Sequence, residues 1–236
     1  MDSRLRAIFF DAGNTLIFPR VEELAQDLTA QGFPATEEDF CAAECAGKRK
    51  LDEWLWPQIR RGEVPRTPDH FYWRKYLQAL MQRIRAPQEE HKRLMGALAE
   101  TFSDIKLWSR VFPETSPFLE RLRSQGYLLG VISNSGGLIE EQLGRLSLAR
   151  HFDAVLDSAI VGVAKPHPGI FQIALARAGV EASDALFVGD TYSTDIGGAQ
   201  LASVRGVLFD RVGAYPDADC PRITSLPEME GLLGTM

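Results

Sequence analysis

Five short apolar runs, spread along the chain, constrain its fold more than any other feature of the sequence. They are "AIFF" at 7–10, "YLLGVIS" at 127–133, "FDAVLDS" at 152–158, "ALFVG" at 185–189 and "VRGVLFD" at 204–210. Apolar runs of this length, bounded by polar and glycine residues, predict buried strands. Helical periodicity at 116–126, 168–180 and 195–204 alternates with the later runs, and this alternation predicts βαβ units. We therefore expect an α/β protein with a doubly wound parallel sheet, covered by helices on both faces.

The stretch between the first and second strands has a different character. It contains four segments with helical periodicity and no convincing strand: 21–32, 36–56, 67–85 and 86–102. Thr36, Thr67 and Ala86-Pro87 are residue types typical of helix starts. About ninety residues are too many for a simple connection between two strands. We expect an all-helical cap domain at 18–108, inserted into a core formed by 1–17 and 109–236.

Composition narrows the classes of function. The net charge is −6, so the sequence has no electrostatic support for nucleic-acid binding. Three cysteines, an odd number, argue against a disulfide framework. No apolar run reaches the roughly 18 residues of a membrane span, and Asp11 interrupts the short N-terminal run. We expect a cytoplasmic protein with no membrane or nucleic-acid partner, and no prediction is made of its oligomeric state.

Polar residues follow the predicted strands in four places. Asp11 with Asn14 and Thr15 follows the first strand, and Ser133-Asn134 follows the second. Lys165-Pro166 opens a predicted helix, and "GDTYSTD" at 189–195 follows the fourth strand. Taken singly, most of these residues have ordinary explanations as helix caps or solvated side chains. Because ligands bind at the carboxyl ends of the strands in doubly wound sheets, we expect the four segments to meet in one crevice.

These residue types suggest phosphate chemistry. A carboxylate such as Asp11 can act as a nucleophile and accept a phosphoryl group. Asp190 and Asp195 could hold Mg²⁺ together with Asp11, since Mg²⁺ binds a few carboxylates along with water and phosphate oxygens. The Ser133 hydroxyl could bind phosphoryl oxygens, and Lys165 supplies the positive charge that a phosphate needs in an acidic protein.

The order "DAGNTL", "VISNS", "AKPHPGIF" and "VGDTYSTD" resembles the haloacid dehalogenase superfamily of hydrolases, from about residue 7 to residue 206. The position of the cap is similar to that in members with a helical cap after the first motif. The resemblance implies a Rossmann-like core and a Mg²⁺ ion held by Asp11, the carbonyl of Gly13 and Asp190, with Asp195 supporting the metal site.

The same resemblance implies roles for the remaining motif residues. Asp11 would be the nucleophile that forms an aspartyl-phosphate, and Ser133, Asn134 and Lys165 would hold the phosphoryl group. The expected activity is Mg²⁺-dependent hydrolysis of a small phosphorylated compound. The motifs identify the superfamily but not the substrate.

Gly13 departs from the family pattern. Phosphatases of this superfamily mostly carry an acid here, which protonates the leaving oxygen and later activates water. A glycine carbonyl can still bind the metal, but the proton donor is missing. General acid–base catalysis is typically worth about 10²–10⁴-fold in rate, so its loss should slow turnover without abolishing it.

A first hypothesis is a slow or specialised phosphatase. Compounds with good leaving groups, such as acyl phosphates, need little protonation. Alternatively, an acid of the cap could replace the missing donor, and the candidates at the start of the cap are Glu22, Glu23 and Asp27. Three tryptophans of the cap, Trp54, Trp56 and Trp73, could line the cleft that selects the substrate.

Two other hypotheses remain open. A phosphonate (C–P bond) hydrolase would keep the metal and use a cap lysine, Lys48 or Lys50, to form an imine. Cleavage of a C–halogen bond is less favoured, because dehalogenases of the family tend to lose the acids found here as Asp190 and Asp195. The third hypothesis is a non-catalytic module that binds phosphate or a partner, but binding alone would not need Asp11.

Overall fold

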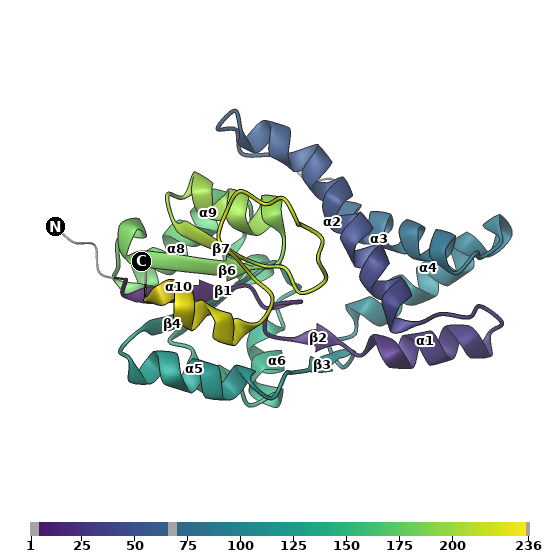
Figure 1. Ribbon diagram of the computed structural model, residues 1–236, viewed down its shortest axis with the longest axis horizontal. Coiled ribbons are helices and arrows are strands. Elements are labelled where there is room, and N and C mark those ends of the chain that lie inside the picture. The colour runs from purple at the N-terminus through teal and green to yellow at the C-terminus, as the bar shows by residue number, and fades with distance from the viewer. Residues whose placement is uncertain (1–4, 66–69, 235–236) are drawn as a thin grey trace.

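The computed structural model describes residues 5–65 and 70–234. Its centre is a parallel sheet in the order β5-β4-β1-β6-β7-β8. The strands are β1 Ala7–Phe10, β4 Leu128–Ser133, β5 Ala154–Asp157, β6 Ala185–Gly189, β7 Arg205–Phe209 and β8 Arg222–Ile223. β1 lies at the centre and the order runs outward from it in both directions (Figure 1). The predicted doubly wound sheet is therefore confirmed.

Helices cover both faces of this sheet. They are α5 Thr115–Ser124, α6 Ile139–Arg145, α7 Ser158–Val161, α8 Pro168–Ala178, α9 Gly198–Leu201 and α10 Met229–Leu233. Because side chains alternate along a strand, Ile8 and Phe10 of β1 pack in one cluster with α5, α6 and α10. Ala7 and Phe9 pack in another cluster with α8 and α9. The apolar run 7–10 is thus buried on both faces, as continuous hydrophobicity predicts.

Four helices occupy the stretch between the first two sheet strands: α1 Val21–Ala30, α2 Glu37–Ile59, α3 Phe71–Arg83 and α4 Gln88–Ser103. We call residues 21–103 the helical segment; they carry a hydrophobic cluster of their own. Thr36 caps α2 in a capping box, and Pro87 precedes α4. The predicted start at Thr67 lies outside the described residues, and α3 is seen to begin at Phe71. The division into a core and a cap domain stays a prediction.

A two-stranded antiparallel ribbon joins the helical segment to the sheet. It consists of β2 Phe18–Pro19 and β3 Trp108–Arg110, one at each end of the segment (Figure 1). The sequence did not predict it, because two or three residues are too few to show periodicity. It holds together the two connections between the sheet and the helical segment. It also places Trp108 beside the loop after β1.

Helix α2 also packs against the segment that follows β6. That segment begins with a π-helical turn, Tyr192–Gly197, and continues as α9, so the helix starts three residues before the predicted position 195. The amide of Ser193 donates a hydrogen bond to Asp52 Oδ1 over 3.0 Å. The Trp56 ring lies over Tyr192, with 4.4 Å between ring centroids. The helical segment is therefore docked on one of the four predicted polar segments.

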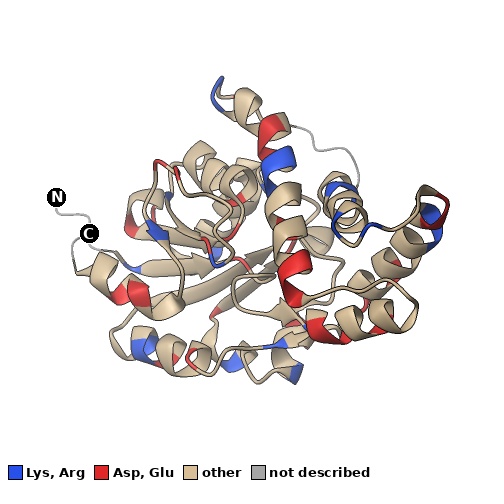
Figure 2. Ribbon diagram, turned by 45° about the vertical axis from the view of Figure 1, so that its right-hand side comes forward, with Lys and Arg blue, Asp and Glu red and all other residues tan. Residues whose placement is uncertain are grey.

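The distribution of charge fits the acidic composition. Figure 2 shows Lys and Arg interspersed with Asp and Glu along the helices of both parts of the chain. No helix among the described residues is both long and apolar enough to cross a membrane. The cysteines Cys41, Cys45 and Cys220 are free thiols.

Candidate active site

The polar segments meet at the carboxyl end of the sheet. Lys165 Nζ lies 2.5 Å from Asp11 Oδ1 and 2.7 Å from Asp195 Oδ1, and all three side chains are buried. One carboxylate oxygen from each of Asp11, Asp190 and Asp195 lies within 4.8 Å of the others. Asp11 and Asp190 directly follow β1 and β6, Asp195 lies in the π-helical turn after β6, and Lys165 lies in the loop before α8. The expected convergence on one crevice is therefore observed for these four residues.

The charges of this cluster perturb one another strongly. Burial raises the pKa of Asp11 to about 7; Lys165 opposes this rise, and Asp195 and Asp190 add to it. Burial likewise raises the pKa of Asp195 against the effect of Lys165. Burial alone would lower the pKa of Lys165, but Asp11 and Asp195 outweigh it and raise the pKa. Buried carboxylates crowded in this way suit a hard cation, because oxygen donors are the ligands such ions prefer. Asp11, Asp190 and Asp195 could therefore hold a metal ion.

Close packing fixes the side chain of Asp195. Its Oδ2 accepts a hydrogen bond from the amide of Thr191 over 2.9 Å. A Cβ at Gly189 would lie 2.5 Å from the carboxyl carbon of Asp195, so only glycine leaves space for this carboxylate. The π-helical turn is a feature often found at functional sites, and here it includes Asp195.

Ser133 and Asn134 differ in their surroundings. Ser133 ends β4, two residues beyond Val131, which pairs with Phe10, and it is buried beside the site. Asn134 Oδ1 accepts a hydrogen bond from the amide of Lys165 over 2.8 Å, and its Nδ2 donates to the Lys165 carbonyl over 2.9 Å. The Asn134 side chain therefore positions the backbone of Lys165. That either residue binds substrate stays a prediction.

The space beside Gly13 is filled by Trp108. A Cβ at Gly13 would lie 3.3 Å from Trp108 Cζ3, closer than ordinary van der Waals contact. The indole is held in place, because its Nε1 donates a hydrogen bond to the Phe102 carbonyl over 2.9 Å. The space next to the Gly13 Cα is therefore occupied by an aromatic ring that comes from β3.

A lysine from α2 reaches the same cluster. Lys48 Nζ lies 2.8 Å from Asp190 Oδ2 and 2.6 Å from Glu44 Oε1, and its side chain is 2% exposed. Glu44 was not predicted from the sequence, although its spacing of four residues from Lys48 puts both on one face of the helix. Lys50, by contrast, is exposed and pairs with Glu53.

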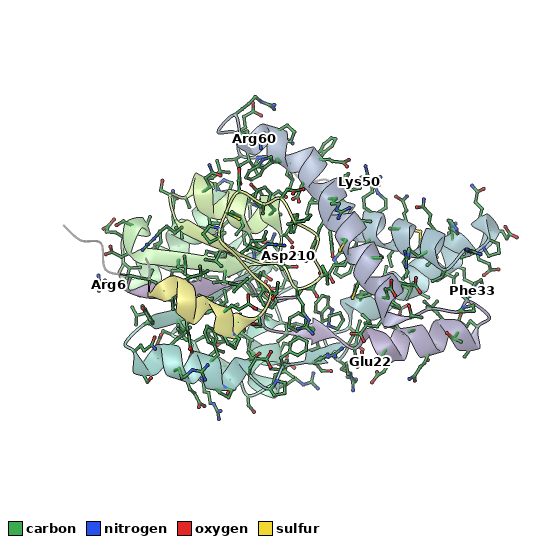
Figure 3. All side chains as sticks on the ribbon, in the orientation of Figure 1. Arg6, Glu22, Phe33, Lys50, Arg60 and Asp210 are labelled. Atoms are coloured by element: carbon green, nitrogen blue, oxygen red, sulfur yellow. The ribbon has the colours of Figure 1, made fainter. Side chains whose placement is uncertain are left out.

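The acids proposed from the sequence as replacement donors lie elsewhere. Glu22 and Glu23 are exposed and pair with Arg110 and Arg20 (Figure 3), and Asp27 is exposed as well. None of these acids lines the cavity described below. They lie on the solvent-exposed face of α1, because Val21, Leu24 and Leu28 are buried on its opposite, apolar face.

A small cavity adjoins Lys48 between the helical segment and the core. Its volume is about 60 Å³, far below the roughly 300–1,000 Å³ of sites for drug-sized ligands. Its aromatic walls include Phe40, Tyr72, Trp73, Tyr76, Phe102 and Trp108. Its polar lining includes Asn14, Glu44, Lys48, Arg110 and Arg211. Trp73 thus lines the space as predicted, whereas Trp56 stacks on Tyr192 and Trp54 is 48% exposed.

Comparison with known proteins identifies the family. A model of the haloacid dehalogenase-like hydrolases matches residues 5–203. A phosphoserine phosphatase from Thermus thermophilus is 37% identical over 227 residues, covering 90% of this chain and 84% of the relative. The crystal structure of a HAD phosphatase from Thermococcus onnurineus has 26% identity and a TM-score of 0.60, covering 98% of both chains.

A dehalogenase is also similar. The crystal structure of a 2-haloacid dehalogenase from Pseudomonas syringae has 28% identity and a TM-score of 0.56, covering 98% of this chain and 99% of the other. The matched region contains all four motifs and the carboxylate cluster described above. The chain belongs to the haloacid dehalogenase-like hydrolases.

Proposed function

We propose that this chain is a Mg²⁺-dependent phosphatase of small phosphorylated compounds that works through an aspartyl-phosphate on Asp11. The observation that carries the proposal is the buried cluster in which Lys165 bridges Asp11 and Asp195, with Asp190 beside them. The similarity to a phosphoserine phosphatase at 37% identity supports the same reaction class.

The chain's own residues have distinct tasks in this reaction. Lys165 lowers the pKa of Asp11, against the burial that raises it to about 7, and holds the Oδ1 that attacks phosphorus in this proposal. The Ser133 hydroxyl donates to a phosphoryl oxygen, while Asn134 keeps the backbone of Lys165 in place. A Mg²⁺ ion on Asp11, Asp190 and the Gly13 carbonyl, supported by Asp195, would neutralise the negative charge of the phosphoryl group.

Phosphoryl chemistry is favoured over dehalogenation by the acids that follow β6. Asp190 and Asp195 are both buried and close to Asp11. Burying carboxylates together is unfavourable unless cations compensate them, and an uncharged haloacid carbon gives them no role. We infer that these carboxylates serve a metal ion and a phosphoryl group.

A phosphonate hydrolase is the second candidate, and the position of Lys48 favours it. An imine with a substrate aldehyde requires a lysine inside the site, and Lys48 fulfils this condition where Lys50 does not. Borohydride added with a phosphonate that carries an aldehyde would trap such an imine as a mass increase on Lys48. A Lys48→Met variant is the control, and absence of the adduct would exclude this candidate.

A panel of phosphate esters, acyl phosphates and phosphonates, assayed with Mg²⁺ and with chelator, tests the main proposal. We expect metal-dependent release of phosphate from the esters, and less than about a thousandth of it from Asp11→Asn. The exposed Asp27→Asn is the matched control and should keep wild-type rates. Full activity of Asp11→Asn would refute the mechanism, and no release by the wild type from any compound would support a binding role instead.

A further inference from the structure

The site has no acid at position 13, yet a buried cation, the ammonium of Lys48, lies between Asp190 and the cavity. We propose that Lys48 is a catalytic residue whose ammonium donates a hydrogen bond to the oxygen leaving phosphorus, and that Glu44 is a positioning residue that aims it. This inference rests on the proposed phosphatase function and extends it to the leaving oxygen of the P–O bond that breaks.

The position of Lys48 carries the first step. Its Nζ contacts Asp190, whose carboxylate is grouped with that of Asp11. Its side chain also lines the cavity between the core and the helical segment. In the proposed complex, a phosphoryl group attacked by Asp11 lies against the carboxylate cluster, and its ester oxygen faces the cavity that Lys48 lines. Lys48 stands at the boundary between the two.

The number of N–H donors of the Lys48 ammonium is the second observation behind the proposal. A lysine ammonium has three N–H donors and no acceptor. Two of them are used by Asp190 Oδ2 at 2.8 Å and Glu44 Oε1 at 2.6 Å. Among residues 5–65 and 70–234, the ion-pair partners of this ammonium are these two carboxylates. One donor of a buried, fully held cation is therefore available for a substrate oxygen.

The position of Glu44 explains why the Lys48 ammonium keeps one orientation. Glu44 lies one helical turn before Lys48 on α2, and its side chain is 16% exposed. The burial of both partners makes a long, flexible lysine adopt one direction. A buried ion pair contributes little net stability. We therefore infer a functional reason for the Glu44–Lys48 pair at the cavity.

The bond changes balance without a further reactant. An Asp11 carboxylate oxygen forms a bond to phosphorus, and the bond from phosphorus to the ester oxygen breaks with its electron pair on that oxygen. The ammonium of Lys48 stabilises the negative charge as it develops, since charge-assisted hydrogen bonds are stronger than neutral ones. The released alkoxide then takes its proton from solvent water.

Leaving-group dependence tests this role. An aryl phosphate has a leaving oxygen that needs little stabilisation, whereas that of an alkyl phosphate needs much. In Lys48→Met we expect kcat to fall about 10²–10³-fold with ethyl phosphate, and less than about tenfold with p-nitrophenyl phosphate. Lys50→Met is the matched control, because Lys50 lies on the outward side of the same helix (Figure 3), is exposed, and pairs with Glu53.

Glu44→Gln supplies a second variant that leaves Lys48 and Asp190 in place, with Glu53→Gln as its control. We expect kcat with ethyl phosphate to fall about tenfold while KM, the aryl rate and the melting shift on adding MgCl₂ stay at wild-type values. A merely structural role would lower both rates together. Equal losses with the two esters in either variant would overturn the inference and leave the proposed function standing. An inactive wild type would overturn both.

Discussion

Gly13, two residues after Asp11, has no side chain that could donate a proton to a leaving group. We expect an acid at this position in most phosphatases of the family, whereas here a Cβ at position 13 would lie 3.3 Å from Trp108 Cζ3. Trp108 also packs edge-on against Trp73, at 6.0 Å between ring centroids. Gly13 and Trp108 are therefore packed together, and a side chain at position 13 requires the indole to move by a few tenths of an ångström.

Restoring the acid tests this coupling between Gly13 and Trp108. We expect Gly13→Asp by itself to lower activity, since the new side chain displaces an anchored indole. The double variant Gly13→Asp, Trp108→Leu has room for the carboxyl group. It should cleave an alkyl phosphate about 10-fold or more faster than Trp108→Leu, because general acid catalysis is worth about 10²–10⁴-fold. Steady-state rates with alkyl and aryl phosphates provide the measurement, and equal rates for the double and single variants would contradict it.

At the scale of elements, α2 links the helical segment to the site. Its apolar residues Leu51, Leu55 and Ile59 form a cluster with partly buried neighbours, and Asp52 between them accepts the Ser193 amide. Burial raises the pKa of Asp52 to about 6, against the effect of hydrogen bonds from Ser193 and Tyr215. An acid buried in this way opposes docking of α2 whenever it is ionised.

The pH dependence of stability follows from this shift. Because the folded pKa of Asp52 exceeds its unfolded value of 3.8, its contribution to stability is full below pH 4 and is lost as the pH rises through 6. Asp52→Asn keeps an acceptor for Ser193 and removes the charge. We expect it to raise the free energy of unfolding by up to about 3 kcal/mol at pH 8, with little change at pH 4. Denaturant titrations at both pH values measure this, and an equal effect at both would contradict the assigned cause.

The helical segment depends on its own core. Leu80 of α3 is fully buried in that cluster. Leu80→Ala should lower the free energy of unfolding by about 2–5 kcal/mol, because it leaves a cavity as well as losing apolar contact. Leu138, which is 48% exposed, offers the control, and Leu138→Ala should change stability by less than about 0.5 kcal/mol. Urea unfolding curves compare the two, and a small effect of Leu80→Ala would show that the cluster repacks.

For the whole molecule, the carboxylate cluster predicts that stability depends on a cation. Asp11 lies far in the chain from the segment that contains Asp190 and Asp195, so an ion bound by all three would link two distant parts of the folded chain. We expect MgCl₂ to raise the melting temperature, with a stabilisation of about 2.7 kcal/mol at a hundred times Kd. EDTA should reverse the shift, and Asp190→Asn should reduce it.

Salt effects and surface charge provide the controls for this measurement. KCl at the same ionic strength should not reproduce the shift. Asp217→Asn changes an exposed carboxylate and should leave the MgCl₂ shift unchanged. A melting temperature that is unchanged over millimolar MgCl₂ would contradict metal binding by the cluster.

Whether the sequence predicted a helix or strand depended on how many residues carried its pattern. The five apolar runs and the start of α2 at Thr36 were found, because several residues share one pattern or a capping box marks the position. The strands β2, β3 and β8 were missed, since each has only two or three residues. Helix α6 was also missed, as its seven residues follow a glycine-rich turn.

The same distinction applies to the candidate site. Asp11, Lys165, Asp190 and Asp195 were predicted because each follows a strand or opens a helix, and chain topology brings such positions to one edge of a parallel sheet. Glu44 has no comparable signal. A helix shows from its sequence which residues share a face, but not which of its faces meets the site.

The sequence by itself therefore determined the doubly wound sheet, the helical stretch after its first strand, the carboxylate and lysine residues at the strand ends and the absence of an acid at Gly13. Only the tertiary structure decided that Trp108 fills the space beside Gly13, that Asn134 positions Lys165 and that Lys48 pairs with Asp190. The physical reason is that local patterns are set by neighbours in the chain, whereas these contacts join residues 31 to 142 positions apart through the docking of separate elements.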